Sequence, residues 1–350
     1  MHRTQGDKAM EYFERFIDKN DLGAMGEASA LLAGEGLALD RHLDRTLGLY
    51  DQRGRLVATG SIFANTLRCL AVDREKQGEG LMARLVTRLT EELFLSGIHH
   101  IFVYTKPETE RMLTDLGFYP IARVPGRLSF LENRRGGFSS YLEGLGEKTE
   151  AGTAGAIIMN ANPFTLGHRC LVQTAASQCD VLHLFIVSED ISFFPFEARK
   201  RLVMAGTQDL KNIVYHDTGS YLISRAVFPA YFLKEEEAVT QAQAALDAAI
   251  FTQVAQRLGV TRRFVGEEPF SPATHLYNQA MGELLPQAGI ALFVVPRMAD
   301  AGGIPVSATR VRRALAEGDT QPLRALLPDS SYDFVISKEG QALIDKRLAE

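Results

Sequence analysis

Short apolar runs alternate with helical patterns throughout the second half of the chain. The runs are GAIIMNA, VLHLFIVS, IVYHDTG, RFVGEE and ALFVVP, which begin at residues 155, 181, 213, 263 and 291. Apolar residues at helical spacing occupy the stretches near 167–177, 196–206, 238–258 and 272–285. Buried strands that alternate with helices predict a parallel sheet with helices on both faces. Ligands of such sheets bind beyond the carboxyl ends of the strands.

The first half has a less regular pattern, which predicts a mixed α/β domain. A charged amphipathic stretch predicts a helix near 8–19, and LGLYDQRGRLVATGSI predicts a hairpin that turns at 51–54. TLRCLAVD, HIFVYT and FYPIARV read as strands. Two helices are predicted by the strings GEGLMARLVTRLTEELFLSG and PETERMLTDLG. The first of them ends at Gly97.

The segment 131–155, LENRRGGFSSYLEGLGEKTEAGTAG, separates the two patterns and is rich in Gly, Ser and charge. Such composition is typical of a boundary between domains. We therefore expect a first domain over 1–135, a linker over 136–152 and a second domain over 153–350. The SSYLEGL portion has an alternative interpretation as a last strand of the first domain.

Composition narrows the class of protein. A chain of 350 residues exceeds one ordinary core, so two domains are expected. The net charge of −5 gives no electrostatic basis for binding nucleic acid or an anionic membrane. The three cysteines lack a CxxC spacing, which argues against a disulfide framework or a zinc site. The N-terminus lacks the apolar core of a signal peptide. No apolar run is long enough to span a membrane, so a cytoplasmic protein is expected.

The string NPFTLGH follows the first buried strand of the second half. Thr165, Gly167 and His168 fall at the start of the next helix. A helix N-terminus presents unpaired N–H groups and a positive dipole end, which favours a phosphate. Gly167 lets the backbone approach closely, while the threonine hydroxyl and the imidazole can donate hydrogen bonds. The alternative is an ordinary helix start with threonine as its cap and histidine on the surface.

A second string of this kind, VSATRVRRAL, spans 306–315. Ser307 and Thr309 are suited to cap a helix there, and Arg310, Arg312 and Arg313 fall in its first turns. Cations at a helix N-terminus oppose the helix dipole, and a bound anion would resolve that conflict. A capped helix with a solvated basic face is the alternative.

TLGH and SATRVR together resemble the two signatures of the HxGH-type nucleotidyltransferase superfamily, over residues 153–350. The resemblance implies a Rossmann-like domain that binds ATP with Mg²⁺ and catalyses attack on the α-phosphate. It implies Thr165, His168 and Arg312 as catalytic residues. The candidate ATP-binding residues around them are Asn162, Phe164, Gly167, Arg199, Glu267, Ser307, Ala308 and Thr309. No histidine spacing indicates a protein metal site.

Longer strings across the chain resemble the citrate lyase ligase family, namely FPFEARKRLVMAG, GSYLISRAVFPAYFLKEEE, VGEEPFSPATHLYNQAM and VPRMADAGGIPVSATRVR. That resemblance implies an AMP-forming ligase that makes acetyl-adenylate from ATP and acetate. The acetyl group would pass to the thiol of the dephospho-CoA-derived prosthetic group on the acyl carrier subunit of citrate lyase. The sequence departs from the family pattern at Arg225 and Val227.

In the first half, LAVDREKQGEGLMARLV resembles the acyl-CoA motif of the GNAT acetyltransferases, and LTDLGF resembles their closing segment. Gly78 and Gly80 keep the glycine positions that free N–H groups for a pyrophosphate, whereas Glu75 replaces a basic or amide residue. We hypothesise that this domain docks the prosthetic arm and does not acetylate an amine. A plain glycine pair at a helix start is the alternative.

Several candidates have equally simple structural interpretations. Phe164 and Phe196 suit a core as well as the wall of a small acid site. The resemblance places Arg199 as a phosphate-side or helix-anchoring arginine, and a surface helix charge is the alternative. Glu267 and Glu268 end a strand at the ligand-binding edge, where they would meet ribose or Mg²⁺ or simply solvent. Two rival functions remain: a nucleotidyltransferase for a small phosphorylated metabolite, and a GNAT acetyltransferase with a nucleotide-sensing domain.

Overall fold

The computed structural model describes residues 12–148, 152–222, 228–229, 231–232, 235–267 and 272–349. The chain forms two compact units. The first comprises Met1–Gly137 with Pro229–Ala242, and the second comprises Phe138–Phe228 with Gln243–Glu350. The linker predicted at 136–152 contains a helix, α4 (Gly137–Gly144), so the expected strand at SSYLEGL is wrong.

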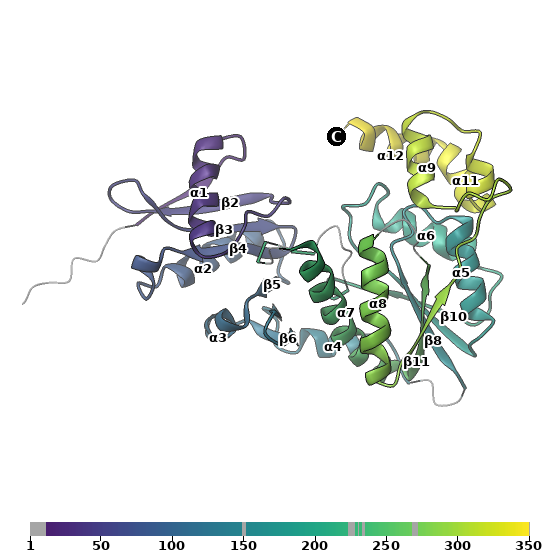
Figure 1. Ribbon diagram of the computed structural model, residues 1–350. Coiled ribbons are helices and arrows are strands. Elements are labelled where there is room, and N and C mark those ends of the chain that lie inside the picture. The colour runs from purple at the N-terminus through teal and green to yellow at the C-terminus, as the bar shows by residue number, and fades with distance from the viewer. Residues whose placement is uncertain are drawn as a thin grey trace, which may run out of the picture. The chain divides into compact units, whose positions relative to one another are not determined.

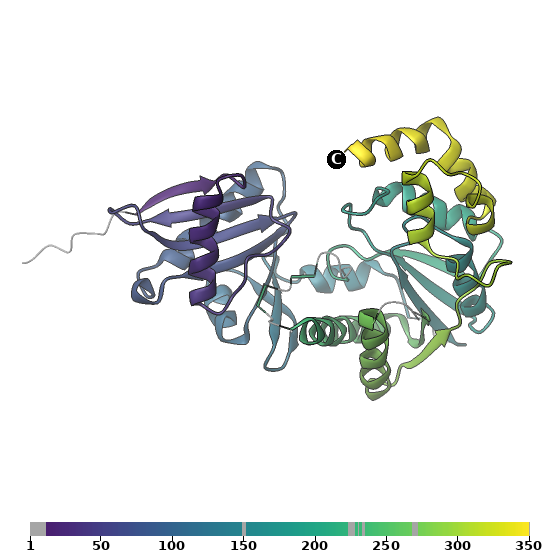
Figure 2. The ribbon, with the colours of Figure 1, turned by 45° about the horizontal axis from the view of Figure 1, so that its top comes forward.

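The first unit is built on one seven-stranded sheet with helices on both faces. The strand order is β1-β2-β3-β4-β5-β7-β6, and β4 and β5 form its parallel pair. In Figure 2 the purple helix α1 crosses the strands. The elements are β1 (Phe13–Ile17), α1 (Leu22–Gly34), β2 (Arg45–Tyr50), β3 (Leu56–Phe63), β4 (Thr66–Val72), α2 (Leu81–Leu95), β5 (Phe102–Thr105), α3 (Pro107–Asp115), β6 (Tyr119–Val124) and β7 (Leu128–Glu132).

Strands β4 and β5 diverge after a short stretch of pairing. They are paired at Thr66 with Phe102 and at Leu67 with Val103, close to the start of each strand. Parallel strands that stop pairing leave unfilled space between their carboxyl ends. The sheet of the first unit is therefore open at this position.

The helix predicted near 8–19 is wrong over its described part, since residues 13–17 form strand β1. Every residue of β1 pairs with β2, from Phe13 opposite Tyr50 to Ile17 opposite Thr46. Arg45 also places its guanidinium 4.0 Å from the centroid of the Phe16 ring. Pairing with a distant strand overrides the local helical propensity of this charged segment. Residues 8–11 lie outside the described part.

The second unit contains a five-stranded, fully parallel sheet in the order β10-β9-β8-β11-β12, as the alternating pattern predicted. Its elements are α4, β8 (Ala154–Met159), α5 (Leu166–Ala176), β9 (Val181–Ile186), α6 (Phe196–Gly206), β10 (Ile213–Asp217), α7 (Glu236–Leu258), β11 (Val260–Gly266), α8 (Pro272–Gln287), β12 (Ala291–Val295), α9 (Ala308–Ala316), α10 (Leu323–Leu326), α11 (Asp329–Ile336) and α12 (Lys338–Ala349).

Two hydrophobic clusters cover the two faces of this sheet. Side chains alternate along β8, so that Ala154 and Ala156 join the cluster under α7 and α8. Ile157 and Met159 join the opposite cluster, under α5 and α6. Figure 1 shows the two helix pairs on either side of the strands. Because the chain leaves β8 toward β9 and later returns to its other side as β11, the strand order reverses at β8, where such sheets bind ligands.

None of the described helices is long and apolar enough to cross a membrane.

Candidate functional site

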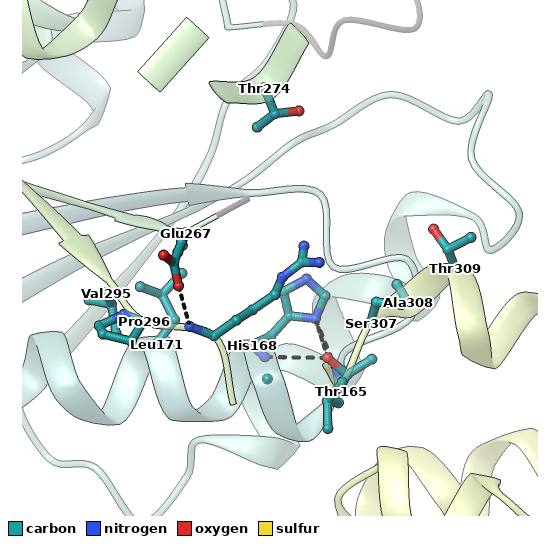
Figure 3. A pocket seen from close by; sticks show the side chains of 14 residues that line it. Thr165, His168, Leu171, Glu267, Thr274, Val295, Pro296, Ser307, Ala308 and Thr309 are labelled. Carbon is teal, nitrogen blue, oxygen red and sulfur yellow. Dashed lines mark hydrogen bonds between the residues drawn. The ribbon is translucent and has the colours of Figure 1, made fainter. Parts of the chain in front are cut away.

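A cavity of about 580 Å³ opens at the carboxyl edge of the sheet in the second unit. One side is the start of α5, with Thr165, Gly167 and His168, and the start of α9 supplies Ser307, Ala308 and Thr309. The floor comes from the residues that end β11 and β12 (Figure 3). Two helix starts separated by about 140 residues therefore share one pocket, in agreement with the convergence that the motifs predict.

A reciprocal cap fixes the start of α5. The Thr165 hydroxyl accepts a hydrogen bond from the His168 N–H at 3.3 Å, and the Thr165 N–H donates to His168 Nδ1 at 3.1 Å. Figure 3 shows these contacts as dashed lines. Two of the N–H groups that a helix start leaves unpaired are thereby satisfied within the motif. The histidine is held by the helix and has no freedom to turn toward solvent.

The same contacts determine the protonation state of His168. Since Nδ1 accepts the Thr165 N–H, the proton of the neutral ring lies on Nε2. Burial, together with the positive charges of Arg297 and Arg312, lowers the pKa of His168 to about 4. At neutral pH the ring is uncharged, and its Nε2–H is the available donor. This is the form that can donate to a phosphate oxygen.

Gly167 joins the two helix starts. A Cβ atom at this position would lie 3.1 Å from the carbonyl oxygen of Val306, the residue before the cap of α9. That separation is tighter than ordinary van der Waals contact, and the obstacle is backbone. The absence of a side chain therefore allows the chain at 306 to pass directly against α5.

The start of α9 is fixed in a similar way. Ser307 caps the helix and accepts the Arg310 N–H at 3.3 Å, while Arg310 forms an ion pair with Asp300 at 2.7 Å. Arg312 donates to the Asn162 carbonyl oxygen at 2.6 Å and to Thr309 Oγ1 at 3.1 Å. Arg312 thus ties α9 to the NPF turn before α5.

Four of the predicted site residues do not line the cavity: Asn162, Phe164 and Arg312, described here, and Arg199, described in the next paragraph. Phe164 is fully buried and stacks on His168 with ring centroids 5.9 Å apart. Asn162 accepts the Phe194 N–H through its side chain, at 2.9 Å, and Arg312 is engaged as described above. These three support the pocket from beneath or from its edge.

The bonds of Arg199 are those of an anchoring residue, one of the two roles that the sequence allowed for it. It is fully buried, and its donors reach the carbonyl oxygens of Phe194, Asn160 and Val187 at 2.8 to 3.0 Å, and that of Glu189. Its guanidinium therefore joins the loops that follow β8 and β9. Arg199 therefore contacts the backbone of these loops and does not line the cavity.

The cavity also contains a cation that the sequence analysis missed. Arg297 lines it, two residues after the end of β12, and its backbone N–H donates to the Glu267 carboxylate at 3.4 Å. Glu267 itself follows β11. The available signal was positional, since a charged residue after a buried parallel strand falls at the ligand-binding edge. Among the described residues, no cluster of three or more His, Cys, Asp or Glu side chains is placed to hold a metal ion.

Gly78 and Gly80 belong to a separate cavity, of about 890 Å³, in the first unit. It occupies the opening between the diverged ends of β4 and β5 and reaches the start of α2. Gly80 caps α2 with a φ of 76°, a left-handed conformation that glycine adopts without strain. The cavity is lined mainly by apolar groups, and Tyr231 and Phe232 form part of its wall.

The acidic residue between these glycines is already paired. Glu79 accepts the Tyr12 hydroxyl and lies 3.4 Å from the ammonium of Lys76. Lys76, before the start of α2, and Lys106, the residue before α3, both line the cavity. The ammonium groups of these two lysines offset the negative charge of the glutamates beside the glycine pair.

Known proteins resemble nearly the whole chain. Residues 154–335 match the family model described as the citrate lyase ligase C-terminal domain. A protein of Klebsiella pneumoniae named [citrate [pro-3S]-lyase] ligase is 42% identical and covers 93% of this chain and 92% of its own. Its namesakes from Escherichia coli K12 and Haemophilus influenzae are 38% and 36% identical, and cover 91% and 85% of this chain.

Solved structures resemble parts of it. A putative acyl-CoA N-acyltransferase from Klebsiella pneumoniae covers 35% of this chain and 97% of its own, at 20% identity and a TM-score of 0.30. A pantoate-beta-alanine ligase from Francisella tularensis covers 60% of this chain and 84% of its own, at 14% identity and a TM-score of 0.35.

Proposed function

Because this chain belongs to the citrate lyase ligase family, we propose that it joins acetate to ATP as acetyl-adenylate and then passes the acetyl group to citrate lyase. The acceptor is the thiol of a dephospho-CoA-derived arm on the acyl carrier subunit. The observation that carries the proposal is the single cavity formed by the starts of α5 and α9. The rival function on a phosphorylated metabolite is not favoured by the family.

The triphosphate of ATP binds between the two helix starts. Both present backbone N–H groups and positive dipole ends to one space, and Arg297 adds a full charge. Ser307, Ala308 and Thr309 hold the β- and γ-phosphates, and Gly167 allows the backbone to approach them. A cavity of about 580 Å³ lies within the range of small-molecule sites.

His168 is the catalytic donor. In the first step a carboxylate oxygen of acetate bonds to the α-phosphorus, the bond to the bridging oxygen of the β-phosphate breaks, and pyrophosphate leaves. His168 Nε2–H donates to the α-phosphate oxygen as charge develops there. Thr165 acts through the histidine and is a positioning residue, because it holds Nδ1 and the ring plane. Arg312 positions the NPF turn beside them.

In the second step the thiol of the prosthetic arm attacks the acetyl carbon. The thioester bond forms, the bond between the acetyl carbon and the phosphate oxygen breaks, and AMP leaves while the thiol proton passes to water. Neither step requires covalent attachment to the protein. Catalysis therefore depends on positioning and on electrostatic stabilisation.

Mg²⁺ accompanies the ATP phosphates in this proposal. Magnesium usually takes one or two carboxylates together with phosphates and water, and Glu267 is the carboxylate that lines the cavity. When bound, the ion neutralises phosphate charge. Glu267 would hold it, and Arg297, whose N–H meets the same carboxylate, keeps that side chain in place.

The cavity of the first unit is the docking site that we propose for the prosthetic arm. An extended arm ending in a thiol fits the opening between β4 and β5, with its phosphate near Gly78, Gly80 and the lysines at 76 and 106. The reaction is expected in the cytoplasm, where thiols stay reduced, as are the three free cysteines of this chain.

The decisive experiment measures AMP formation from ATP and acetate, with and without deacetylated citrate lyase. We expect acetate-dependent pyrophosphate exchange by the protein alone, and AMP in proportion to lyase thiol when the lyase is present. Absence of acetate-dependent exchange would reject the ligase mechanism. Acetylation of amines from acetyl-CoA without ATP would instead support the acetyltransferase alternative.

A further inference from the structure

A side chain from a distant part of the sequence lies where β4 and β5 separate in the first unit. The two strands stop pairing after Leu67 and Val103. Tyr231 follows Tyr104 of β5 by 127 residues in the chain, yet it belongs to the same compact unit. It lines the cavity between the two strands and is 8% exposed.

The separation of the strands turns two buried backbone groups toward this place. β4 contains a bulge here, since the register of its pairing with β3 shifts between Thr59 and Ser61. Cys69, within the bulged part of β4, has a φ of 53°. Cys69 and Tyr104 are both almost fully buried, and buried backbone groups need hydrogen-bond partners.

The hydroxyl of Tyr231 meets both of these groups. It donates to the carbonyl oxygen of Tyr104 at 2.9 Å, and the N–H of Cys69 donates to the same hydroxyl. Burial raises the pKa of Tyr231, so the phenol stays protonated and keeps its donor. One phenol therefore bridges β4 and β5 just beyond the point where their own hydrogen bonds stop.

The backbone and the ring of Tyr231 are held as well. The N–H of Ala38, which follows α1, donates to the carbonyl oxygen of Tyr231 at 2.7 Å. The ring of Phe232 packs edge-on to that of Tyr231, with centroids 5.1 Å apart, and lines the same cavity. With its hydroxyl, its carbonyl and its ring all in contact, Tyr231 forms a fixed wall.

The glycine pair and Tyr231 mark opposite ends of the cavity. Gly78 and Gly80 lie at the start of α2, and residues 70–72 of β4 line the space from the bulge toward that helix. Three residues of a strand span about 10 Å. An arm that places its phosphate at the glycines therefore directs its thiol toward the phenol.

We infer that Tyr231 is a specificity-determining residue of this cavity. Its ring ends the space, so the cavity admits a pantetheine-type thiol or its acetyl thioester and excludes a longer acyl chain. The wall is supplied by the segment that follows residue 228, which belongs to neither of the motifs that resemble an acetyltransferase. The inference rests on the proposed function, because it requires the arm to dock in the first unit.

The first test measures how affinity depends on chain length in the wild-type protein. Calorimetry compares two stable thioethers, S-ethylpantetheine and S-hexylpantetheine, with the full-length chain. We expect the hexyl compound to bind about tenfold more weakly, the scale of overpacking a filled site. An open inner end would give the reverse order, because each additional buried methylene strengthens binding. Equal or tighter binding of the hexyl compound overturns the inference.

The second test removes the wall. In Tyr231→Ala the space continues past the bulge, so the hexyl compound should bind at least as tightly as the ethyl compound. Tyr119→Ala, exposed on β6 and outside the cavity lining, is the matched control and should keep the wild-type preference. Loss of a purely structural tyrosine would weaken both compounds equally, and an unchanged ratio would therefore contradict the inference. Tyr231→Leu, which is smaller and still apolar, decides the matter if Tyr231→Ala fails to fold.

A third variant shows that the analogues report on this cavity. Thr109→Trp fills the cavity from α3 and should weaken binding of S-ethylpantetheine by about tenfold or more. Undiminished binding in that variant, or no binding by the wild type, rejects the docking site and this inference with it. Acetate-dependent pyrophosphate exchange is measured independently, so the ligase reaction is judged separately.

Discussion

At the scale of single residues, the proposed chemistry depends on one imidazole in a defined tautomer. The Thr165 N–H occupies Nδ1 of His168, and the pKa of about 4 keeps the ring neutral at physiological pH. A neutral ring donates through Nε2 without adding charge to the phosphate site. The stacked Phe164 ring and the helix start prevent the imidazole from turning away.

His168→Ala is expected to lower acetate-dependent pyrophosphate exchange by roughly 10²-fold or more, the scale of losing one oriented donor in a transition state. Because the N–H groups of both helix starts remain, ATP binding should change far less than the rate. Isotope exchange and analogue calorimetry measure the two quantities. His99→Ala, in the first unit and exposed, is the control. Exchange near the wild-type rate in His168→Ala would remove the donor role.

At the scale of elements, the site depends on how closely two helix starts approach. Gly167 permits the contact between α5 and the segment before α9, and Arg312 ties α9 to the NPF turn that precedes α5. Neither helix start alone forms a phosphate site of this depth. A substitution that pushes the two helix starts apart should therefore weaken the site.

In Gly167→Ala the new methyl group meets the Val306 carbonyl oxygen at 3.1 Å, so the two helix starts must move apart. We expect weaker binding of the ATP analogue by about tenfold, equivalent to about 1.4 kcal/mol. Gly282→Ala, inside α8, is the matched control, because the nearest atom there is a methyl group of Leu292 in β12 at 3.7 Å, an ordinary van der Waals distance. Calorimetry that gave equal affinities for the two variants would contradict the close-approach argument.

Strands β9 and β10 contain a histidine pair that links stability to pH. His183 Nδ1 and His216 Nε2 are 2.9 Å apart, and both side chains are buried. Burial lowers the pKa of His216 to about 4 and also lowers that of His183. Both folded pKa values lie below the unfolded value of about 6.5, so the unfolded chain binds more protons at acidic pH.

The stabilisation from this pair is complete above about pH 6.5 and is lost as the pH falls toward 4. His216→Gln keeps a hydrogen-bonding group and removes one titration, so its melting temperature should fall less steeply between these values. Thermal unfolding at half-unit pH intervals measures the slope. His42→Gln, at an exposed position, should retain the wild-type slope. Identical slopes in His216→Gln and the wild type would assign the acid sensitivity to other groups.

At the scale of the whole molecule, each unit contains one of the two cavities described above, and the proposal divides the reaction between these cavities. The adenylate forms in the second unit, and the first unit holds the arm that receives the acetyl group. Each cavity is lined by residues of its own unit. The two half-reactions should therefore respond to different substitutions.

Thr109→Trp fills part of the first cavity from α3. We expect a higher KM for deacetylated citrate lyase, by about tenfold or more, and unchanged acetate-dependent pyrophosphate exchange, because bulk is added in only one unit. Thr114→Trp, exposed on the same helix and outside the cavity, is the control. Both rates are measured with full-length protein. Loss of exchange in Thr109→Trp would show that the cavities are not independent in function.

Sequence alone determined the elements with strong local signals. The alternation of strands and helices after residue 153 predicted the parallel sheet. The TLGH and SATRVR strings predicted two helix starts that bind the same phosphate ligand. These features depend on hydrophobic periodicity and on capping chemistry, which act between residues close in the chain. The resemblance of these motifs to a known family then predicted the reaction.

Only the tertiary structure decided the features that depend on distant residues. Pairing with β2 made a strand of residues 13–17, and burial among carbonyl oxygens gave Arg199 its bonding partners. The place of Arg297 in the cavity lining follows from the neighbouring segments and not from its own sequence context. Long-range pairing, burial and unmet charge arise when segments far apart in sequence pack together, so no local pattern encodes them.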